Sequence, residues 1–317
     1  MSHEQASAAW QDRTARLLLE RRVLREIPSP ALTVAVIAYR SPDATLDCLR
    51  AIQRACERAS IPVERLLADC GGNERFGGAL RGLADTELRL EPDLSLNAAR
   101  NVVLAYSAAP LIMLIDDDGL LEPDAVVAML RHFDDPAVVA ARGRIRFKEQ
   151  RYFTTLATHY DRGRDVIDDT LATEGHMAIR RGAAIEAGGF DERLFGHEGL
   201  ELTYRLLRGA PGGRVIYMPD VVMRHDFVRG FQHFYRKSVA YHGLRDAVVA
   251  LHADDPGFVA FADADNRRVR PGPRLRPDEW LARTGLRALQ GALGLVTRFR
   301  SRGNPESWGH ASPRRHG

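Results

Sequence analysis

Eight consecutive residues decide how this chain folds: Leu111-Ile112-Met113-Leu114-Ile115, followed directly by Asp116-Asp117-Asp118. The short aliphatic run predicts a strand that is buried on both faces of a parallel sheet. Three adjacent carboxylates at the end of a buried strand repel one another, which is costly unless a cation compensates them. Capping of a following helix is the alternative, but a cap needs one carboxylate rather than three. The stretch therefore predicts a strand that ends in a site for a divalent metal ion and phosphate groups.

Strand and helix patterns alternate around this stretch. The expected strands of the first half are residues 32–38, 63–68, 86–90 and 111–115. The expected helices are residues 8–26, 42–59, 95–106 and 122–132. This alternation predicts an α/β fold with a mostly parallel, Rossmann-like central sheet and helices on both faces. Ligands of such sheets bind at the carboxyl ends of the strands, where Tyr39, Asp69 and Asp116 lie.

The alternation weakens after Pro136. The expected strands of the second half are residues 138–147, 171–179 and 214–218, and the expected helices are residues 181–187, 198–208 and 228–244. We expect this half to extend the first rather than to fold independently.

The composition of the 317 residues is that of a soluble globular protein, with 45% hydrophobic and 27% charged residues. It excludes collagen-like, wholly disordered and disulfide-scaffold classes. No apolar run approaches the roughly 20 residues that span a bilayer, and the first residues lack the order of a secretory signal. Cys48, Cys56 and Cys70 match neither a disulfide framework nor a zinc site. We therefore expect free thiols and a cytoplasmic location.

The C-terminal segment carries a concentrated positive charge. Residues 266–317 contain twelve arginines, no lysine and three acidic residues, although the whole chain has a net charge of only +3. Residues 279–299 can form an amphipathic helix, which would lie on an anionic membrane surface. Packing on its own domain or on a second subunit, and a solvated tail, are the alternatives.

Several motifs, taken in order, resemble the family 2 glycosyltransferases, which are nucleotide-sugar-dependent enzymes of the GT-A fold. The similar stretches are Val34–Arg40, Asp69–Gly72, Leu96–Asn101, Asp116–Asp118, Gly188–Glu192, Glu198 and His225. The resemblance implies a GT-A domain over residues 31–245, with a nucleotide-sugar half (31–135) and an acceptor half (136–245). An N-terminal helix (1–30) and an arginine-rich tail (246–317) would flank it.

The resemblance also implies roles for individual residues. Donor contacts would come from Ala38, Tyr39, Asp69, Arg100, Asp116 and Asp117. Asp116, Asp118 and His225 would bind Mn²⁺ or Mg²⁺. Tyr39 either stacks on the nucleobase or packs as a core aromatic. Arg100 pairs either with phosphate or with an acidic neighbour. His176 and His197 are alternative histidines that would face the acceptor.

One departure concerns the catalytic base. The family's acceptor-side helix usually opens with Glu-Asp, whereas this chain has Glu198-Gly199. An inverting transfer needs a carboxylate within reach of the attacking hydroxyl. Glu198 is the first candidate and Glu201, nearly on the same helix face, is the second. The missing aspartate also leaves retention of configuration open.

The sequence thus predicts a metal-dependent, hexosyltransferase-like enzyme. It would move a sugar from a nucleoside diphosphate sugar, with UDP-sugars favoured, to an acceptor hydroxyl of unknown identity, and the favoured outcome is inversion. A degenerate GT-A-like binding module and a sugar nucleotidyltransferase are the alternatives. The latter lacks the expected glycine-rich loop, because residues 39–42 read Tyr-Arg-Ser-Pro. No nucleic-acid partner is expected, and the tail is the candidate for peripheral contact with an anionic membrane.

Overall fold

The computed structural model describes residues 3–39, 41–71, 76–92, 94–241 and 243–301. Arg40 and Gly72 of the motifs quoted above, and the arginines beyond residue 301, lie outside these ranges. The chain divides into two compact units. Unit 1 comprises Met1–Arg146, Thr158–His225 and Leu244–Pro273, and unit 2 comprises Phe147–Ala157, Asp226–Gly243 and Arg274–Gly317.

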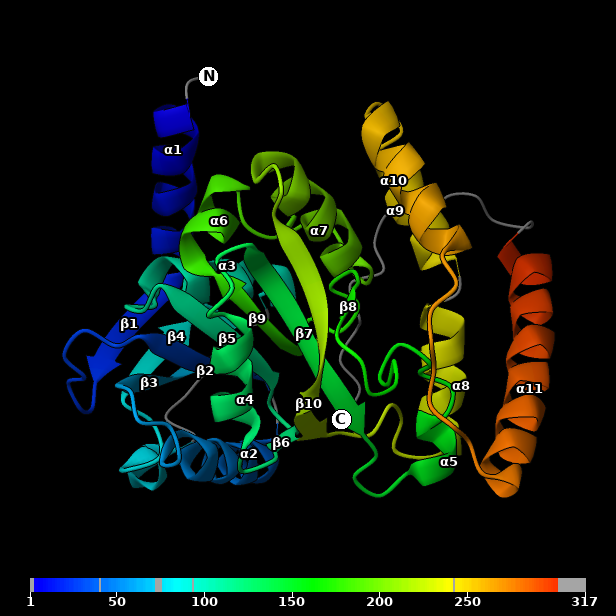
Figure 1. Cartoon of the computed structure of the whole chain (residues 1–317), viewed down its shortest axis with the longest axis horizontal. Coiled ribbons are helices and arrows are strands. Elements are labelled where there is room, and N and C mark those ends of the chain that lie inside the picture. Colours follow the sequence, from blue (N-terminus) through cyan, green and yellow to red (C-terminus); the bar gives the residue numbers. More distant parts are fainter. Residues whose placement is uncertain (1–2, 40, 72–75, 93, 242, 302–317) are drawn as a thin grey trace. The chain divides into compact units, whose positions relative to one another are not determined.

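Unit 1 is built on a single mixed sheet (Figure 1). Its strands are β1 (Leu18–Val23), β2 (Leu32–Ala38), β3 (Val63–Asp69), β4 (Thr86–Leu90), β5 (Leu111–Asp116), β6 (Leu120–Leu121), β7 (Val138–Arg146), β8 (Ile167–Asp168), β9 (His176–Arg180) and β10 (Arg214–Arg224). The strand order is β1-β4-β3-β2-β5-β9-β7-β10-β6, with β8 paired to β10. Strands β4, β3, β2 and β5 run parallel, as predicted, whereas β9 is antiparallel to both of its neighbours.

The register of the parallel strands brings the predicted ligand-binding residues to one edge. Ala38 of β2 pairs with Asp69 of β3, and Ile37 pairs with Asp116 of β5. All seven residues of both β2 and β3 are buried, because helices cover both faces of the sheet. The carboxyl ends of three strands therefore meet at one place, which is where ligands bind in sheets of this kind.

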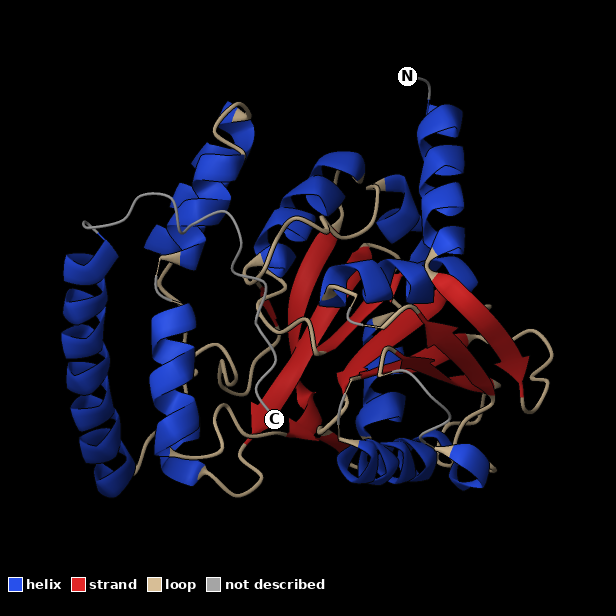
Figure 2. Cartoon of the chain, turned by 180° about the vertical axis from the view of Figure 1, so that it is seen from behind, coloured by secondary structure: helices blue, strands red, loops and turns tan. Residues whose placement is uncertain are grey.

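Two groups of helices form the layers on either side of the sheet (Figure 2). The helices of unit 1 are α1 (His3–Arg16), α2 (Pro42–Cys56), α3 (Leu96–Tyr106), α4 (Ala125–His132), α6 (Arg181–Glu186), α7 (Glu198–Gly209), α9 (Leu244–Leu251) and α10 (Pro256–Arg267), with a short 3₁₀ turn at Gly77–Leu80. Helices α2 and α4 pack together, whereas α3, α6 and α7 form the other group. The predicted cap of α3 is confirmed, since the Ser95 hydroxyl accepts a hydrogen bond from the Ala98 amide.

The predicted helix over residues 8–26 is wrong in its second half. Helix α1 ends at Arg16, and Leu18–Val23 form strand β1 along the edge of the sheet, antiparallel to β4. The side chains of β1 alternate between half-buried and exposed, which is the period of a strand. The spacing of Leu17, Leu18 and Leu24 fits the period of a helix as well as that of a strand, so pairing with β4 decides that this segment is a strand.

Other element boundaries also differ from the predictions. Residues 171–175 are a loop and only His176–Arg180 form strand β9, while β10 continues past residue 218 to Arg224. The helix expected over residues 228–244 begins at Phe231 and ends at Ala240, and helices α9 and α10 were not predicted. The extension of β10 matters most, because it carries the chain to His225.

Unit 2 contains α5 (Arg151–Thr154), α8 (Phe231–Ala240) and α11 (Pro277–Ser301). Its small core consists of Phe153, Val228 and Phe234, against which Leu286 and Leu293 of α11 pack. Both oxygens of the Asp226 carboxylate accept backbone amides of residues 148–150, which ties the start of the unit together. Within the residues that the structure describes, no helix has the length and apolar character needed to cross a membrane.

Candidate active site

The acidic end of β5 turns sharply at residues 116–119. The Gly119 amide donates to the Asp116 carbonyl at 2.9 Å, which closes a tight turn, and all three aspartates are half-buried. A side chain at Gly119 would place its Cβ 2.3 Å from the sulfur of Met223 in β10. The glycine therefore allows β6 and β10 to approach each other closely.

This approach brings His225 to the aspartates. Leu120 of β6 pairs with Arg224, the last residue of β10, so His225, which follows the strand, lies beside Asp118. The His225 Nε2 atom is 3.0 Å from Oδ1 of Asp118 and 3.9 Å from Oδ2 of Asp116. Its Nδ1 atom shares a hydrogen bond of 3.1 Å with the Tyr160 hydroxyl, which orients the ring. The structure thus brings together the three residues predicted from the sequence as metal ligands.

The donor set fits a hard divalent cation. Carboxylate oxygens and a neutral imidazole nitrogen are ligands for Mn²⁺ and Mg²⁺. Among the described residues, however, no group of three or more histidine, cysteine, aspartate or glutamate side chains is arranged so that these side chains alone could hold a metal ion. An open arrangement suits an ion such as Mg²⁺, which is held by one or two carboxylates and completed by substrate phosphates and water.

The neighbouring strand ends hold the remaining residues of the predicted donor side. Asp69 is buried, and its Oδ1 atom accepts the Gly71 amide at 2.9 Å. The Tyr39 amide faces Oδ2 of Asp117 at 3.4 Å, and the Tyr39 hydroxyl donates to the Leu94 carbonyl at 3.1 Å. Burial raises the pKa of the Tyr39 phenol well above its ordinary value. The Tyr39 ring also packs against the main hydrophobic core, so both its ring and its hydroxyl have partners within the protein.

Arg100 pairs with a carboxylate of α7 rather than with the aspartate cluster. Its guanidinium lies 2.8 Å from Oε1 of Glu198 and 2.9 Å from Oδ1 of Asn97, and it stacks over the Phe190 ring. Arg100 is 3% exposed and Glu198 is 7% exposed. Of the two partners predicted for Arg100, phosphate and an acidic side chain, the structure shows the acidic side chain.

Glu174 was missed by the sequence analysis. It precedes β9 in the loop that was predicted as strand, and its Oε1 atom accepts the Gly199 amide at 2.7 Å. Burial, followed by the charge of Glu198, raises the pKa of the Glu174 carboxyl to about 7. No local pattern marks this residue, because only the return of the chain at α7 brings it to Glu198.

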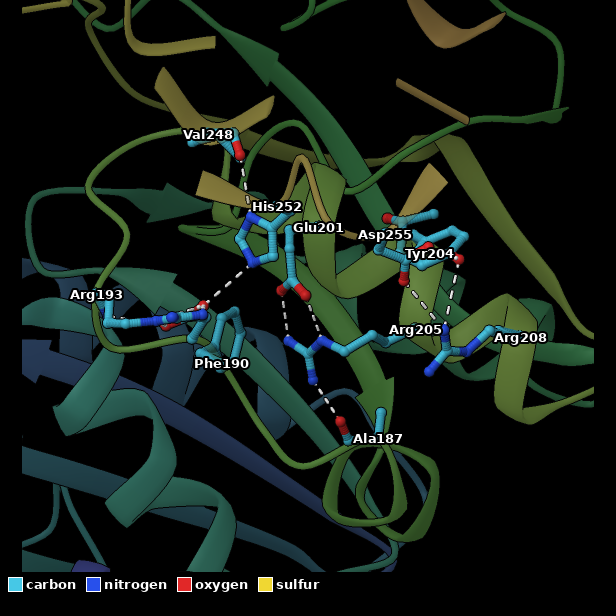
Figure 3. Close-up of polar contacts among 12 residues, drawn as sticks. Ala187, Phe190, Arg193, Glu201, Tyr204, Arg205, Arg208, Val248, His252 and Asp255 are labelled. Atoms are coloured by element: carbon cyan, nitrogen blue, oxygen red, sulfur yellow. Dashed lines mark hydrogen bonds and ion pairs between the residues drawn. The ribbon is translucent and has the colours of Figure 1, made fainter. Parts of the chain in front are cut away.

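Glu201, the second candidate base, has different surroundings from Glu198. Arg205 holds its carboxylate with two nitrogens, at 2.5 and 2.6 Å. The pair lines a polar cavity of about 520 Å³ whose lining includes Tyr204, Arg208 and His252 (Figure 3). Asp116, Asp117, Asp118 and His225 do not line this cavity. The two candidate bases therefore lie in separate surroundings, although both belong to the first turns of α7.

The two alternative histidines are also separated. His176 is fully buried, and its Nε2 atom donates to the Val221 carbonyl at 3.0 Å. Burial lowers the pKa of His176 to about 4, so the ring is neutral. His197 is exposed and precedes α7 in a left-handed backbone conformation, with φ of 57°.

A central, mostly parallel sheet with helices on both faces is the architecture of GT-A glycosyltransferases, and the fold of this chain is of that class. The sequence pattern described as "Glycosyltransferase like family 2" matches residues 8–240, and the chain belongs to this family.

Similar proteins agree with this assignment. A solved mannosyltransferase from Pyrobaculum calidifontis, in complex with GDP-Man and Mn²⁺, has a similar fold, with a TM-score of 0.57 and 18% identity over 96% of both chains. The pre-mycofactocin glycosyltransferase of Mycobacterium tuberculosis is 26% identical over 168 residues, which are 50% of this chain and 35% of the relative. An uncharacterised protein of the same organism is 23% identical over 201 residues, which are 56% of this chain and 62% of the relative. The chain thus matches less than two thirds of the length of these curated relatives.

Proposed function

We propose that this glycosyltransferase moves a hexosyl group from a nucleoside diphosphate sugar to an acceptor hydroxyl, in a reaction that depends on Mn²⁺ or Mg²⁺. The observation that carries the proposal is the approach of His225 to Asp118 and Asp116 at the carboxyl end of β5. The registered ends of β2 and β3 lie beside this strand, with Ala38 and Asp69 at the edge. A cation held there, when bound, would take up the charge of the departing diphosphate.

The chain's own residues supply donor binding. Asp69 has acceptor oxygens suited to a base N–H or a ribose hydroxyl, and Asp117 is suited to the ribose. The Tyr39 ring, fixed by its hydroxyl, offers an aromatic face for the nucleobase. Asp116 and Asp118, oriented with His225, form the diphosphate end of the same edge. We favour UDP-sugars as donors, and the GDP-mannose of the structural relative makes GDP-sugars the second choice.

We further propose an inverting displacement. The acceptor oxygen attacks the anomeric carbon, and a carboxylate at or beside the start of α7 removes its proton. Glu198, the residue favoured by the sequence, belongs to this carboxylate group through its buried contact with Arg100. Glu201 is less suited, because both of its oxygens are bound by Arg205.

Release of nucleoside diphosphate from UDP-N-acetylglucosamine, GDP-mannose and related donors, with and without Mn²⁺, tests the proposal. We expect release from one class of donor, and we expect chelation of the metal to abolish it. Release of pyrophosphate from nucleoside triphosphates and sugar phosphates, or equal rates in the presence of chelator, would contradict it.

We also propose that α11 makes peripheral contact with anionic membranes of the cytoplasm. Leu286 and Leu293 pack on unit 2, whereas Trp280, Leu281 and Leu289 are exposed beside arginines such as Arg287. The helix therefore packs on its own unit and still presents a second, exposed apolar set with basic neighbours, which is the composition of an interfacial helix.

A further inference from the structure

A glutamate from outside α7 occupies the beginning of that helix. The Glu174 carboxylate reaches α7 from the loop before β9 and accepts the Gly199 amide at 2.7 Å. The first amides of a helix have no partner within the helix, so a carboxylate is stabilised there. The residue as a whole is half-buried.

Gly199 makes room for this carboxylate. A Cβ atom at position 199 would lie 2.5 Å from Oε1 of Glu174 and 1.7 Å from the Leu171 carbonyl oxygen. Any side chain there would collide with the loop that carries Glu174. The vacancy noted in the sequence at position 199 is therefore filled in space by a carboxylate from another part of the chain.

Glu198 beside it has one oxygen satisfied and one not. Arg100 binds Oε1 at 2.8 Å, whereas Oε2 is inaccessible to solvent and has no hydrogen-bond partner among the described residues. A buried acceptor without a donor is costly, and a proton on a neighbouring carboxyl would satisfy it. Arg100 thus binds Glu198 directly, and its charge also lowers the pKa of the neighbouring Glu174.

The same loop touches the proposed diphosphate edge. The Asp116 amide donates to the Gly175 carbonyl at 2.8 Å, and a Cβ on Gly175 would lie 1.9 Å from Oδ1 of Asp116. The residue after Glu174 therefore packs directly under the carboxylate of Asp116. This contact connects the Glu174–Glu198 carboxylates with the place where the donor would release its diphosphate.

From this arrangement we propose that the Glu174 and Glu198 carboxylates together take up one proton, and that Glu174, when the pair is deprotonated, is the base that takes this proton from the attacking hydroxyl. The proposal deepens the proposed glycosyl transfer and rests on it. The acceptor O–H bond breaks as its oxygen bonds to the anomeric carbon, and the bond from that carbon to the diphosphate oxygen breaks with it. The proton passes to Glu174, is held by Oε2 of Glu198, and leaves to water after product release.

The charged groups that face Glu174 set the pH range of this step. They are Glu198 of α7 and Arg100 of α3; the former raises and the latter lowers the pKa of Glu174, which stands at about 7 chiefly through burial. A base acts in its deprotonated form, so the rate should rise with pH through this range. Removal of the Glu198 charge should shift the rise to lower pH, and the freed Arg100 would shift it in the same direction.

Hydrolysis of UDP-N-acetylglucosamine or GDP-mannose in the presence of Mn²⁺, measured from pH 5 to 9, tests the base without an identified acceptor, because water then takes the place of the acceptor hydroxyl. We expect Glu174→Gln to lower kcat at least about 100-fold and to remove the rise with pH. The donor KM should stay within about threefold, as for a group that acts only in the transition state. Glu174→Asp should recover part of the rate.

Glu198→Gln should move the midpoint of the rise down by about one pH unit. Exposed Glu57→Gln is the matched control and should behave as wild type.

A Glu174→Gln variant with wild-type kcat and the same pH profile would overturn the inference while leaving the proposed function intact. Absence of turnover by the wild-type chain with every donor would instead overturn the proposed function. A titration that needs no turnover then decides on the pair: in protein labelled with ¹³C at the glutamate carboxyls, one resonance should titrate near neutral pH and be missing from Glu174→Gln. If no such resonance exists, the shared proton is refuted.

Discussion

The Nε2 atom of His225 lies 3.0 Å from Oδ1 of Asp118, although the two residues belong to opposite halves of the family match. Pairing of β6 with β10 creates this contact, and Gly119 permits it by leaving space for Met223.

Removal of either partner should impair metal binding. We expect Asp118→Ala to abolish donor hydrolysis, and His225→Ala to weaken Mn²⁺ binding in the presence of UDP by about 10- to 100-fold. Calorimetric titration of Mn²⁺ measures this separately from turnover. Asp124→Asn, a change in an exposed ion pair with Arg58, is the control and should bind Mn²⁺ normally. Unchanged Mn²⁺ affinity in both site variants would show that the metal does not bind at this edge of the sheet.

The glycine at the start of α7 should not tolerate a side chain. Gly199→Ala would force its Cβ against the Leu171 carbonyl and Glu174, and we expect a loss of at least about 1–3 kcal/mol in the free energy of unfolding. Gly209→Ala, at the other end of the same helix, meets no atom within 4 Å and should stabilise by about 0.5–1 kcal/mol. Urea unfolding of the two variants measures both effects. Equal effects would show that the close approach at Gly199 is absent in solution.

Glu201 should matter for stability more than for rate. Its carboxylate is buried and bound by Arg205, so Glu201→Gln should lower the free energy of unfolding by about 1–3 kcal/mol. The kcat of donor hydrolysis should stay within about threefold of wild type, in contrast to Glu174→Gln. A large fall in kcat at unchanged stability would instead move the base to Glu201.

His176 should make the protein sensitive to acid. Its pKa is lowered to about 4 from the ordinary 6.5, so below pH 6.5 the unfolded chain binds the proton more readily than the native one. Stability attributable to His176 is therefore complete above about pH 6.5 and is lost as the pH falls toward 4, by about 3 kcal/mol in total. The free energy of unfolding of His176→Asn, followed by urea titration across this range, should fall less steeply than that of wild type. Parallel curves would contradict the assignment.

The exposed apolar residues of α11 should govern binding to anionic vesicles. We expect Trp280→Ser with Leu281→Ser to reduce co-sedimentation with phosphatidylserine vesicles severalfold, because these side chains would insert below the headgroups. Donor hydrolysis should be unchanged, since neither residue belongs to unit 1. Equal co-sedimentation of wild type and variant, or equal binding to neutral vesicles, would exclude an anionic membrane as the partner.

Local pattern was sufficient for much of the fold. The aliphatic runs that became β2, β3 and β5, the Ser95 cap and the carboxylates after Ile115 all act over a few neighbouring residues, so they are legible in the chain. Leucines near residue 18 were misread because their spacing fits either period, and only pairing with β4 selects the strand. The start of strand β9 was also misplaced, since its pairing with β5 begins only at His176 and its pairing with β7 at Met177.

By itself, the sequence determined that strands end in carboxylates on a parallel sheet, and that the usual aspartate after Glu198 is replaced by glycine. Only the tertiary structure decided which carboxylates meet. In the folded chain Arg100 pairs with Glu198, and Arg205 pairs with Glu201. Glu174 accepts the Gly199 amide from a loop that has no recognisable sequence pattern. The reason is physical: whether a carboxylate is ionised, paired or protonated depends on burial and on charges within a few ångströms, and those neighbours are set by how distant segments pack.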